Sequence, residues 1–149
     1  MSTRSRCSSR NPPIWIGGAS DAALRRAARF AALWQPTPLP VAELVERQTA
    51  LHQACGQIGR GTIPTRMSFR VEFSTVTGNA PSSDKRPIGH GTPTQVAGDL
   101  LGYREKAGLD AFQINFHGNR NLDQLLQSME CFMREVAPIV SGERIGSKN

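Results

Sequence analysis

The chain contains 149 residues, of which 38% are hydrophobic and 20% are charged. This length supports one ordinary domain with its own core, and the composition excludes a largely disordered chain. No apolar run approaches the roughly 18 residues of a membrane-spanning helix, so no membrane partner is expected. The 3 cysteines are widely spaced and odd in number, which excludes a disulfide framework and favours a reduced, cytoplasmic protein.

The net charge of +6 is distributed unevenly along the chain. Residues 1–90 contain 12 Lys and Arg against 5 Asp and Glu, whereas residues 91–149 contain 6 against 7. This basic excess could serve nucleic acid, a phosphorylated cofactor or solubility alone. Nucleic acid is the least favoured, because the arginines are scattered with little aromatic interleaving. Residues 1–11 lack the apolar segment of a secretion signal and are expected to be a disordered basic tail, and residues 141–149 a flexible tail.

A glycine-containing junction opens the structured part of the chain, in the sequence PPIWIGGASDAALRRAARFAALW at residues 12–34. The run from Ile14 to Ile16 is apolar, of β-branched and aromatic type, which predicts a buried strand. Ser20 is a favourable N-cap, and the apolar positions after it recur at helical spacing, which predicts a helix ending near Trp34. Residues 40–55 predict a second helix, whose shared face consists of Leu44, Gln48, Leu51 and Cys55.

Two later segments alternate between apolar and polar residues, as half-buried strands do. They are MSFRVEF at residues 67–73 and DAFQINFH at residues 110–117. Residues 74–91 show no periodicity and predict a long loop. The stretch TPTQ at residues 92–95 forms a capping box and predicts a helix that ends at Gly108. A last helix is expected from Asn121 to Pro138, with an apolar side made of Leu122, Leu125, Leu126, Met129, Met133 and Val136.

The predicted order is strand, two helices, strand, helix, strand, helix. Alternating strands and helices predict an α/β fold with parallel strands and right-handed crossovers. An open doubly wound sheet would have two apolar faces, whereas two of these strands are polar on one face. That pattern fits the lining of a barrel mouth, where active sites gather. The residues expected to share the polar side are Ser68, Arg70, Glu72, Gln113, Asn115 and His117.

Three segments form an ordered set at plausible spacing. They are PPIWIGGASDAALRRAARFAALWQP at residues 12–36, GTPTQVAGDLLGYREKAGLDAFQINF at residues 91–116 and FMREVAP at residues 132–138. Together they resemble the C-terminal part of the luciferase-like monooxygenase family, whose members are flavin- or deazaflavin-dependent oxidoreductases. The resemblance implies a partial (β/α)8 TIM barrel at residues 12–140, about the last three βα units with parallel strands.

The same resemblance implies an enzyme segment that binds FMN or a deazaflavin coenzyme and a small organic substrate. The implied chemistry is hydride transfer or oxygen insertion. Two departures stand against it: FAALW at residues 30–34 replaces the family's GDGW, and the first five barrel strands have no counterpart in this sequence. The alternative is a non-catalytic truncated homologue that acts as an interaction partner or has no activity. A complementary barrel chain or a homo-oligomer is the expected partner in either case.

The candidate cofactor-binding residues are Gly17, Gly18, Ala19 and Ser20. Glycines let the backbone approach a ligand, and the helix start after them offers N–H donors to a phosphate-bearing tail. The alternative is a tight turn in which Ser20 is only a helix cap. No nucleophile–base pair and no metal-ligand cluster is recognisable, so no catalytic or metal-binding residue is assigned. Ordinary roles are expected elsewhere: structural pairing for Arg70 and Glu72, polar filling for Asn115 and His117, a loop for His90 and a partly exposed helix for His52.

Overall fold

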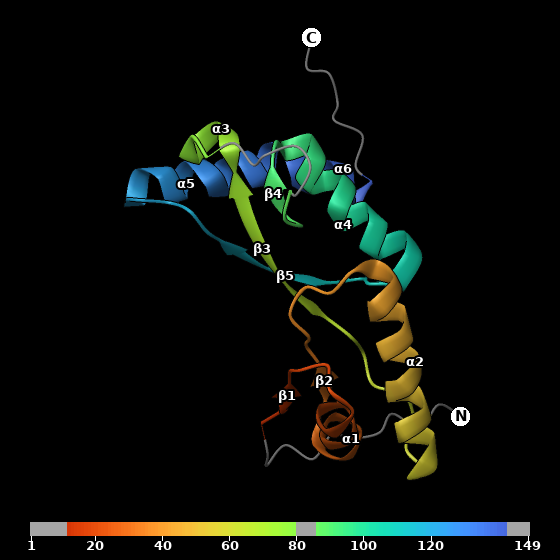
Figure 1. Cartoon of the computed structure of the whole chain (residues 1–149). Helices are drawn as coiled ribbons and strands as arrows, with labels where there is room; N and C mark the ends of the chain where they lie inside the picture. The colour runs from red at the N-terminus through yellow and green to blue at the C-terminus, as the bar shows by residue number, and fades with distance from the viewer. Residues whose placement is uncertain (1–11, 80–85, 143–149) are drawn as a thin grey trace, which may run out of the picture.

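The computed structural model describes residues 12–79 and 86–142, which form parallel strands with helices packed against them (Figure 1). The first half comprises β1 (Trp15–Ile16), α1 (Asp21–Phe30), β2 (Leu33–Trp34) and α2 (Val41–Gln57). The second half comprises β3 (Met67–Phe73), α3 (Ser74–Thr77), β4 (His90–Gly91), α4 (Pro93–Ala107), β5 (Phe112–Phe116), α5 (Leu122–Cys131), the π-helical segment η2 (Phe132–Val136) and α6 (Ala137–Ser141).

The strands form two short parallel sheets that are joined through the backbone. β1 pairs with β2, while β3 pairs with β4 on one edge and with β5 on the other. The sheets meet where the Trp34 amide donates to the Pro64 carbonyl and the Arg66 amide donates to the Trp34 carbonyl. The strand order is therefore β1-β2-β3-β5. β2 and β4 lie on the same edge of β3, β2 near its start and β4 near its end. Within the described residues, β1 and β5 are the outermost strands of this order.

The alternation in β3 and β5 produces one buried face and one polar face, as the sequence predicts. Every second residue of β3 from Met67 to Phe73 is fully buried, and the residues between them are less buried. The parallel register places Ser68 opposite Gln113 and Arg70 opposite Asn115. The prediction of parallel strands with a shared polar side is thus confirmed. Figure 1 shows α2 and α4 along one flank of β3 and β5, with the opposite flank left open.

A strand that the sequence pattern does not reveal lies between α1 and α2. The first predicted helix ends at Phe30, and β2 follows it at once. The described chain therefore contains four βα units, β1-α1, β2-α2, β3-α4 and β5-α5, rather than about three. A two-residue strand has no periodicity to recognise. Only tertiary packing defines it, because the Trp34 side chain is fully buried and its backbone pairs with β1 on one side and the Thr65 segment on the other.

Other boundaries also differ from expectation. The predicted loop at residues 74–91 contains α3 at its start and β4 at its end. Pro138 does not end the last helix, because the π-helical turn η2 leads into α6 and helical structure continues to Ser141, inside the predicted tail. The remaining predictions of tails fall on residues 1–11 and 143–149, which lie outside the described residues. Among the helices that are described, none is long and apolar enough to cross a membrane.

The apolar side predicted for the last helix is mostly exposed in this chain by itself. Leu122, Leu126, Met129 and Met133 are between 45% and 67% exposed. The buried positions of α5 and η2 are Ser128, Cys131 and Val136, of which only Val136 belongs to the predicted apolar side. Figure 1 shows the reason, because α5 lies at one end of the helical layer, beside α3, and no further helix covers it.

Candidate functional site

The turn from Gly17 to Ser20 connects β1 to the N-terminus of α1. Gly18 has a φ of +85°, a conformation that favours glycine, and its carbonyl accepts a 2.8 Å hydrogen bond from Nε1 of the buried Trp34. A Cβ atom on Gly17 would lie 3.1 Å from the carbonyl oxygen of Gln35. Both glycines therefore have a structural role, because the turn passes close to the backbone after β2 and bends sharply into α1.

Ser20 is the helix cap, since its Oγ accepts a 3.3 Å hydrogen bond from the Ala23 amide. The amides of Asp21 and Ala22 belong to the first turn and have no acceptor within the helix itself. The Asp21 carboxylate next to them forms a 2.9 Å ion pair with Arg47 of α2, which offsets its negative charge. The turn is exposed apart from Ala19, which is half-buried. The geometry thus provides a cap and, in addition, accessible donors at the positive end of a helix.

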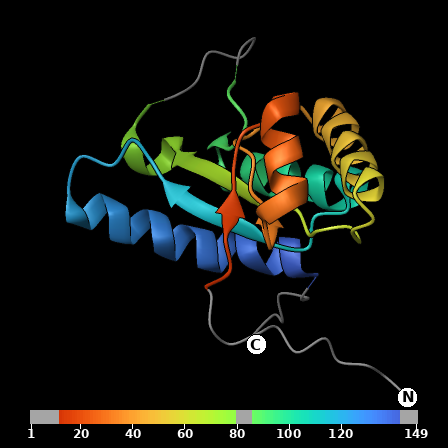
Figure 2. The ribbon, with the colours of Figure 1, turned by 90° about the horizontal axis from the view of Figure 1, so that it is seen from below.

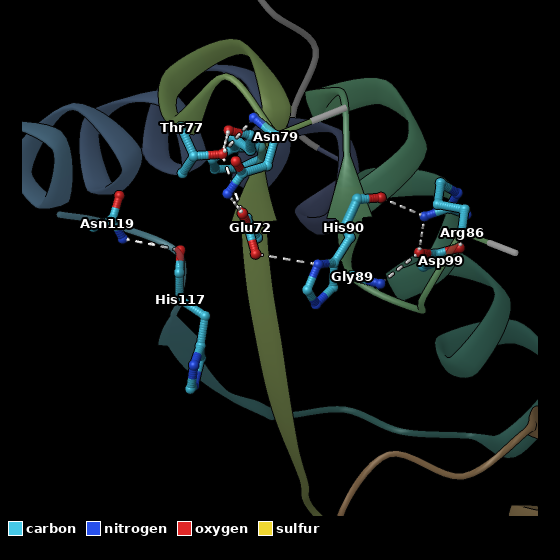
Figure 3. Close-up of polar contacts among 10 residues, drawn as sticks. Glu72, Thr77, Asn79, Arg86, Gly89, His90, Asp99, His117 and Asn119 are labelled. Carbon is cyan, nitrogen blue, oxygen red and sulfur yellow. Dashed lines mark hydrogen bonds and ion pairs between the residues drawn. The ribbon is translucent and has the colours of Figure 1, made fainter. Parts of the chain in front are cut away.

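A polar cluster occupies the carboxyl ends of β3 and β4 (Figure 3). The Glu72 carboxylate accepts hydrogen bonds from Asn79 Nδ2 at 2.7 Å and from Thr77 Oγ1 at 3.1 Å. Its other oxygen lies 3.4 Å from Nδ1 of His90, the residue opposite Glu72 in the β3–β4 register. The side chains of Glu72 and His90 are only 14% and 27% exposed. Gly118, where the chain leaves β5, has a φ of +74°, which favours glycine, and a Cβ atom there would lie 2.3 Å from the Glu72 carboxylate.

The backbone around His90 is held by a second set of contacts. The Arg86 guanidinium forms a bidentate ion pair with the carboxylate of Asp99, which lies on α4, and both N–O distances are 2.7 Å. Arg86 also donates to the His90 carbonyl at 2.7 Å, and the Gly89 amide donates to Asp99 at 2.8 Å. The hydrogen bonds that the Arg86 guanidinium donates to Asp99 raise its pKa above the ordinary value. The imidazole is therefore fixed through its backbone and through Glu72, and Figure 3 shows a ring nitrogen turned toward the Glu72 carboxylate.

The structure brings only some of the residues singled out in the sequence into one site. The expected structural pairing is found for Glu72, whereas Arg70 is exposed and forms no ion pair with the described residues. The expectation of a loop at His90 is wrong, because the residue belongs to β4. His117 is exposed at the end of β5, and His52 is exposed on α2. Asn115 lies half-buried within the sheet and donates to Ser68 Oγ at 2.8 Å.

Four residues of the cluster escaped the sequence analysis, namely Thr77, Asn79, Arg86 and Asp99. Thr77 and Asn79 lie in a segment without periodicity, and Arg86 follows it. Asp99 is one of several charged residues on α4. Thr77 and Asn79 reach Glu72 because α3 and the turn after it follow β3 directly. Arg86 and Asp99 lie next to His90, which comes beside Glu72 only through the pairing of β3 with β4.

Two further titratable groups are perturbed away from this cluster. Burial, together with the Asp99 charge, raises the pKa of Tyr103 to about 12. Burial and the neighbouring Glu135 carboxylate raise the pKa of the Cys131 thiol. Both shifts favour the neutral form, which suits packed structural residues rather than a nucleophile. No group of three or more metal-ligating side chains gathers anywhere in residues 12–79 and 86–142.

Solved structures share this fold at low sequence identity. A riboflavin lyase with modified FMN and riboflavin matches 89% of this chain with a TM-score of 0.66 and 16% identity. A long-chain alkane monooxygenase matches 93% with a TM-score of 0.64 and 15% identity. An F420-dependent secondary alcohol dehydrogenase with an F420–acetone adduct matches 89% with a TM-score of 0.64 and 11% identity. This chain covers 43%, 44% and 50% of those three chains, respectively.

These similarities define the class of fold. The chain has a mixed α/β architecture with parallel strands that matches part of the fold of these solved enzymes. It spans half or less of the length of each matched chain. No protein-family model and no curated protein matches the sequence. The resemblance seen in the sequence is therefore supported at the level of the fold.

Proposed function

We propose that the chain is the C-terminal part of a luciferase-like flavin- or deazaflavin-dependent oxidoreductase, and that the turn from Gly17 to Ser20 binds the phosphate-bearing tail of the cofactor. The observation that carries the proposal is the exposed glycine turn at the start of α1, within a fold shared with enzymes solved with FMN or F420. The bound cofactor would supply hydride transfer or oxygen insertion on a small organic substrate.

The turn fits a phosphate in three respects. Its backbone is exposed, so a ligand can approach it. The α1 N-terminus presents the amides of Asp21 and Ala22, and a helix start favours an anion. The Asp21 carboxylate, which would repel a phosphate, is paired with Arg47 at 2.9 Å. The residues present are therefore compatible with the phosphate of either FMN or a deazaflavin coenzyme.

The groups proposed to meet the substrate lie on the polar face of the strands. Glu72 and His90 stand at the carboxyl ends of β3 and β4, the end of a parallel barrel at which active sites gather. Glu72 holds Nδ1 of the imidazole, so that the rest of the ring is left to contact a ligand. In this proposal His90 donates or accepts a hydrogen bond at the substrate, and Glu72 orients it.

The test is a fluorescence titration of the purified chain with FMN and, separately, with coenzyme F420. We expect Gly18→Val to weaken the affinity by about tenfold or more, because valine at a φ of +85° forces the turn to move. Helical content, measured by circular dichroism, should be unchanged.

The matched control is Gly59→Val. Gly59 also has a positive φ, of +68°, but it follows α2 and a Cβ atom there would meet no neighbour. This variant should bind the cofactor like the unaltered chain. Equal affinity in both variants would show that Gly18 serves only the turn, and failure to bind either cofactor would contradict the proposed function.

A non-catalytic interaction partner is the second candidate function. The exposed side of α5 and η2, made of Leu122, Leu126, Met129 and Met133, favours it. Large exposed apolar patches commonly mark protein interfaces. This alternative predicts that the chain associates through α5 while binding neither FMN nor F420, so the titration above distinguishes the two functions.

A further inference from the structure

Exposed apolar side chains gather at the two outer edges of the strand order. Of the ten large hydrophobic residues that are exposed in the described chain, seven lie at these edges. Such residues are costly to leave in water when they form a contiguous patch. Those on the β1–α1 edge are Ile14, Trp15 and Phe30, and those on the β5–α5 edge are Leu122, Leu126, Met129 and Met133.

The two edges carry opposite charge. α1 has three arginines and one aspartate, whereas α5 and η2 together have three carboxylates and one arginine. Like edges would therefore repel one another, and unlike edges would attract. The exposed charged residues are Asp21, Arg25, Arg26 and Arg29 on α1, and Asp123, Glu130, Arg134 and Glu135 on α5 and η2.

The strands themselves are suited to the same pairing. β1 and β5 are the ends of the order β1-β2-β3-β5, and unpaired strand edges readily pair with another chain. A cavity of about 410 Å³ lies beside β5 and is lined in part by Phe112, Ile114 and Phe132. Figure 2 shows α5 along one flank of β5, with α1 and α2 gathered at the other end of the molecule.

The number of strands in the described residues fits a second copy of the chain at these edges. The order contains four parallel strands, half of the eight that close a (β/α)8 barrel. The matched solved chains are at least twice as long as the part that this chain covers. A twofold rotation about the barrel axis preserves strand direction. It would therefore place β5 of one copy parallel to β1 of the other at both junctions.

We propose that two copies of this chain associate into one eight-stranded barrel. The β1–α1 edge of each copy lies against the β5–α5 edge of the other. The dimer buries the apolar side chains of both edges, pairs α1 arginines with α5 carboxylates, and brings the two Glu72–His90 clusters to a common mouth. This association goes beyond the proposed function, because a second copy of the chain supplies the four strands that the proposed function expects from an N-terminal part of the enzyme, and it does not depend on cofactor binding.

Analytical ultracentrifugation of the full chain tests the proposal. The unaltered chain should sediment as a dimer that dissociates on dilution. Met129→Glu should raise the dissociation constant at least about tenfold, because it places a charge in an apolar contact. Val45→Glu is the control, since Val45 is also an exposed apolar residue within a helix but belongs to α2, away from both edges. It should leave the dimer unchanged.

Charge reversal provides the second measurement. Arg29→Glu and Glu130→Arg should each weaken the dimer, and the double variant should recover part of the loss. A chain that stays monomeric over about a hundredfold range of concentration would overturn the proposal. So would a dimer that Met129→Glu and both charge reversals leave intact. A monomer that still binds FMN would reject the association while retaining the proposed function.

Discussion

Helices α4 and α5 have similar N-terminal caps, but their apolar faces differ in burial. Thr92 caps α4 through a capping box, and Asn121 caps α5 by accepting the Gln124 amide at 2.9 Å. Both sequences predict an apolar face. α4 buries that face, with Leu100 and Tyr103 each 1% exposed, whereas α5 leaves most of its own in water. An amphipathic pattern therefore identifies the face of a helix that can be buried, but it does not identify the element that covers this face.

Position in the fold explains the difference. α4 packs against α2, η2 and α6 and lies over β3, so its apolar side has neighbours on every flank. α5 contacts α3, β5 and η2 but ends the helical layer (Figure 1). Because of this difference in burial, substitutions on α4 and on α5 should have unequal effects on stability.

The largest effect is expected from truncating one leucine on each helix. Leu100→Ala should lower the free energy of unfolding by about 2–5 kcal/mol, because it opens a cavity in the core. Leu126→Ala should change it by less than about 0.5 kcal/mol in the dissociated chain, because Leu126 is 52% exposed. Denaturant unfolding at low protein concentration measures both values. Similar losses for the two variants would show that α5 is covered within one chain.

The next effect is a pH dependence that arises from Tyr103 on α4. Tyr103 ionises near pH 12 in the folded chain and near pH 10 when unfolded, because burial disfavours the phenolate. Its contribution to stability is complete below pH 10 and falls as the pH rises to 12, by about 2 kcal/mol in all.

Tyr103 is the single tyrosine of the chain, so the absorbance of its phenolate reports this titration directly. In the Tyr103→Phe variant, the free energy of unfolding should no longer fall by this amount between pH 10 and 12. A phenolate that appears near pH 10 in the folded chain would contradict the burial of α4.

The smallest effect concerns the caps. Thr92→Ala and Asn121→Ala should each cost about 1 kcal/mol, because each leaves a helix amide without its acceptor. For α4 the loss should appear in global unfolding. For α5 it should appear mainly as faster hydrogen exchange in that helix, because few buried contacts couple α5 to the core. Equal global losses would indicate that α5 unfolds only with the whole chain.

Much of the fold could be predicted because it depends on residues close in sequence. The cap at Thr92, the stop at Gly108 and the alternation in residues 67–73 each involve spacings of two to four residues or one backbone conformation. The shared polar side of β3 and β5 follows from that same period of two. The glycine turn before α1 is also local, since Gly18 requires a positive φ and Ser20 caps the helix.

The features that escaped prediction depend on segments far apart in the chain. β2 is a strand because Trp34 is buried and its backbone bonds to segments near residues 14–16 and 64–66. Glu72 meets His90 because β3 pairs with β4, and the ion pair between Arg86, just before β4, and Asp99 of α4 holds the backbone of His90 in place. Local sequence accounts for most helices, for the alternating strands and for the apolar faces, because sterics, capping and periodicity act over a few residues. Which faces are covered and which polar groups meet depends on the tertiary fold, because burial requires neighbours that the local chain does not supply.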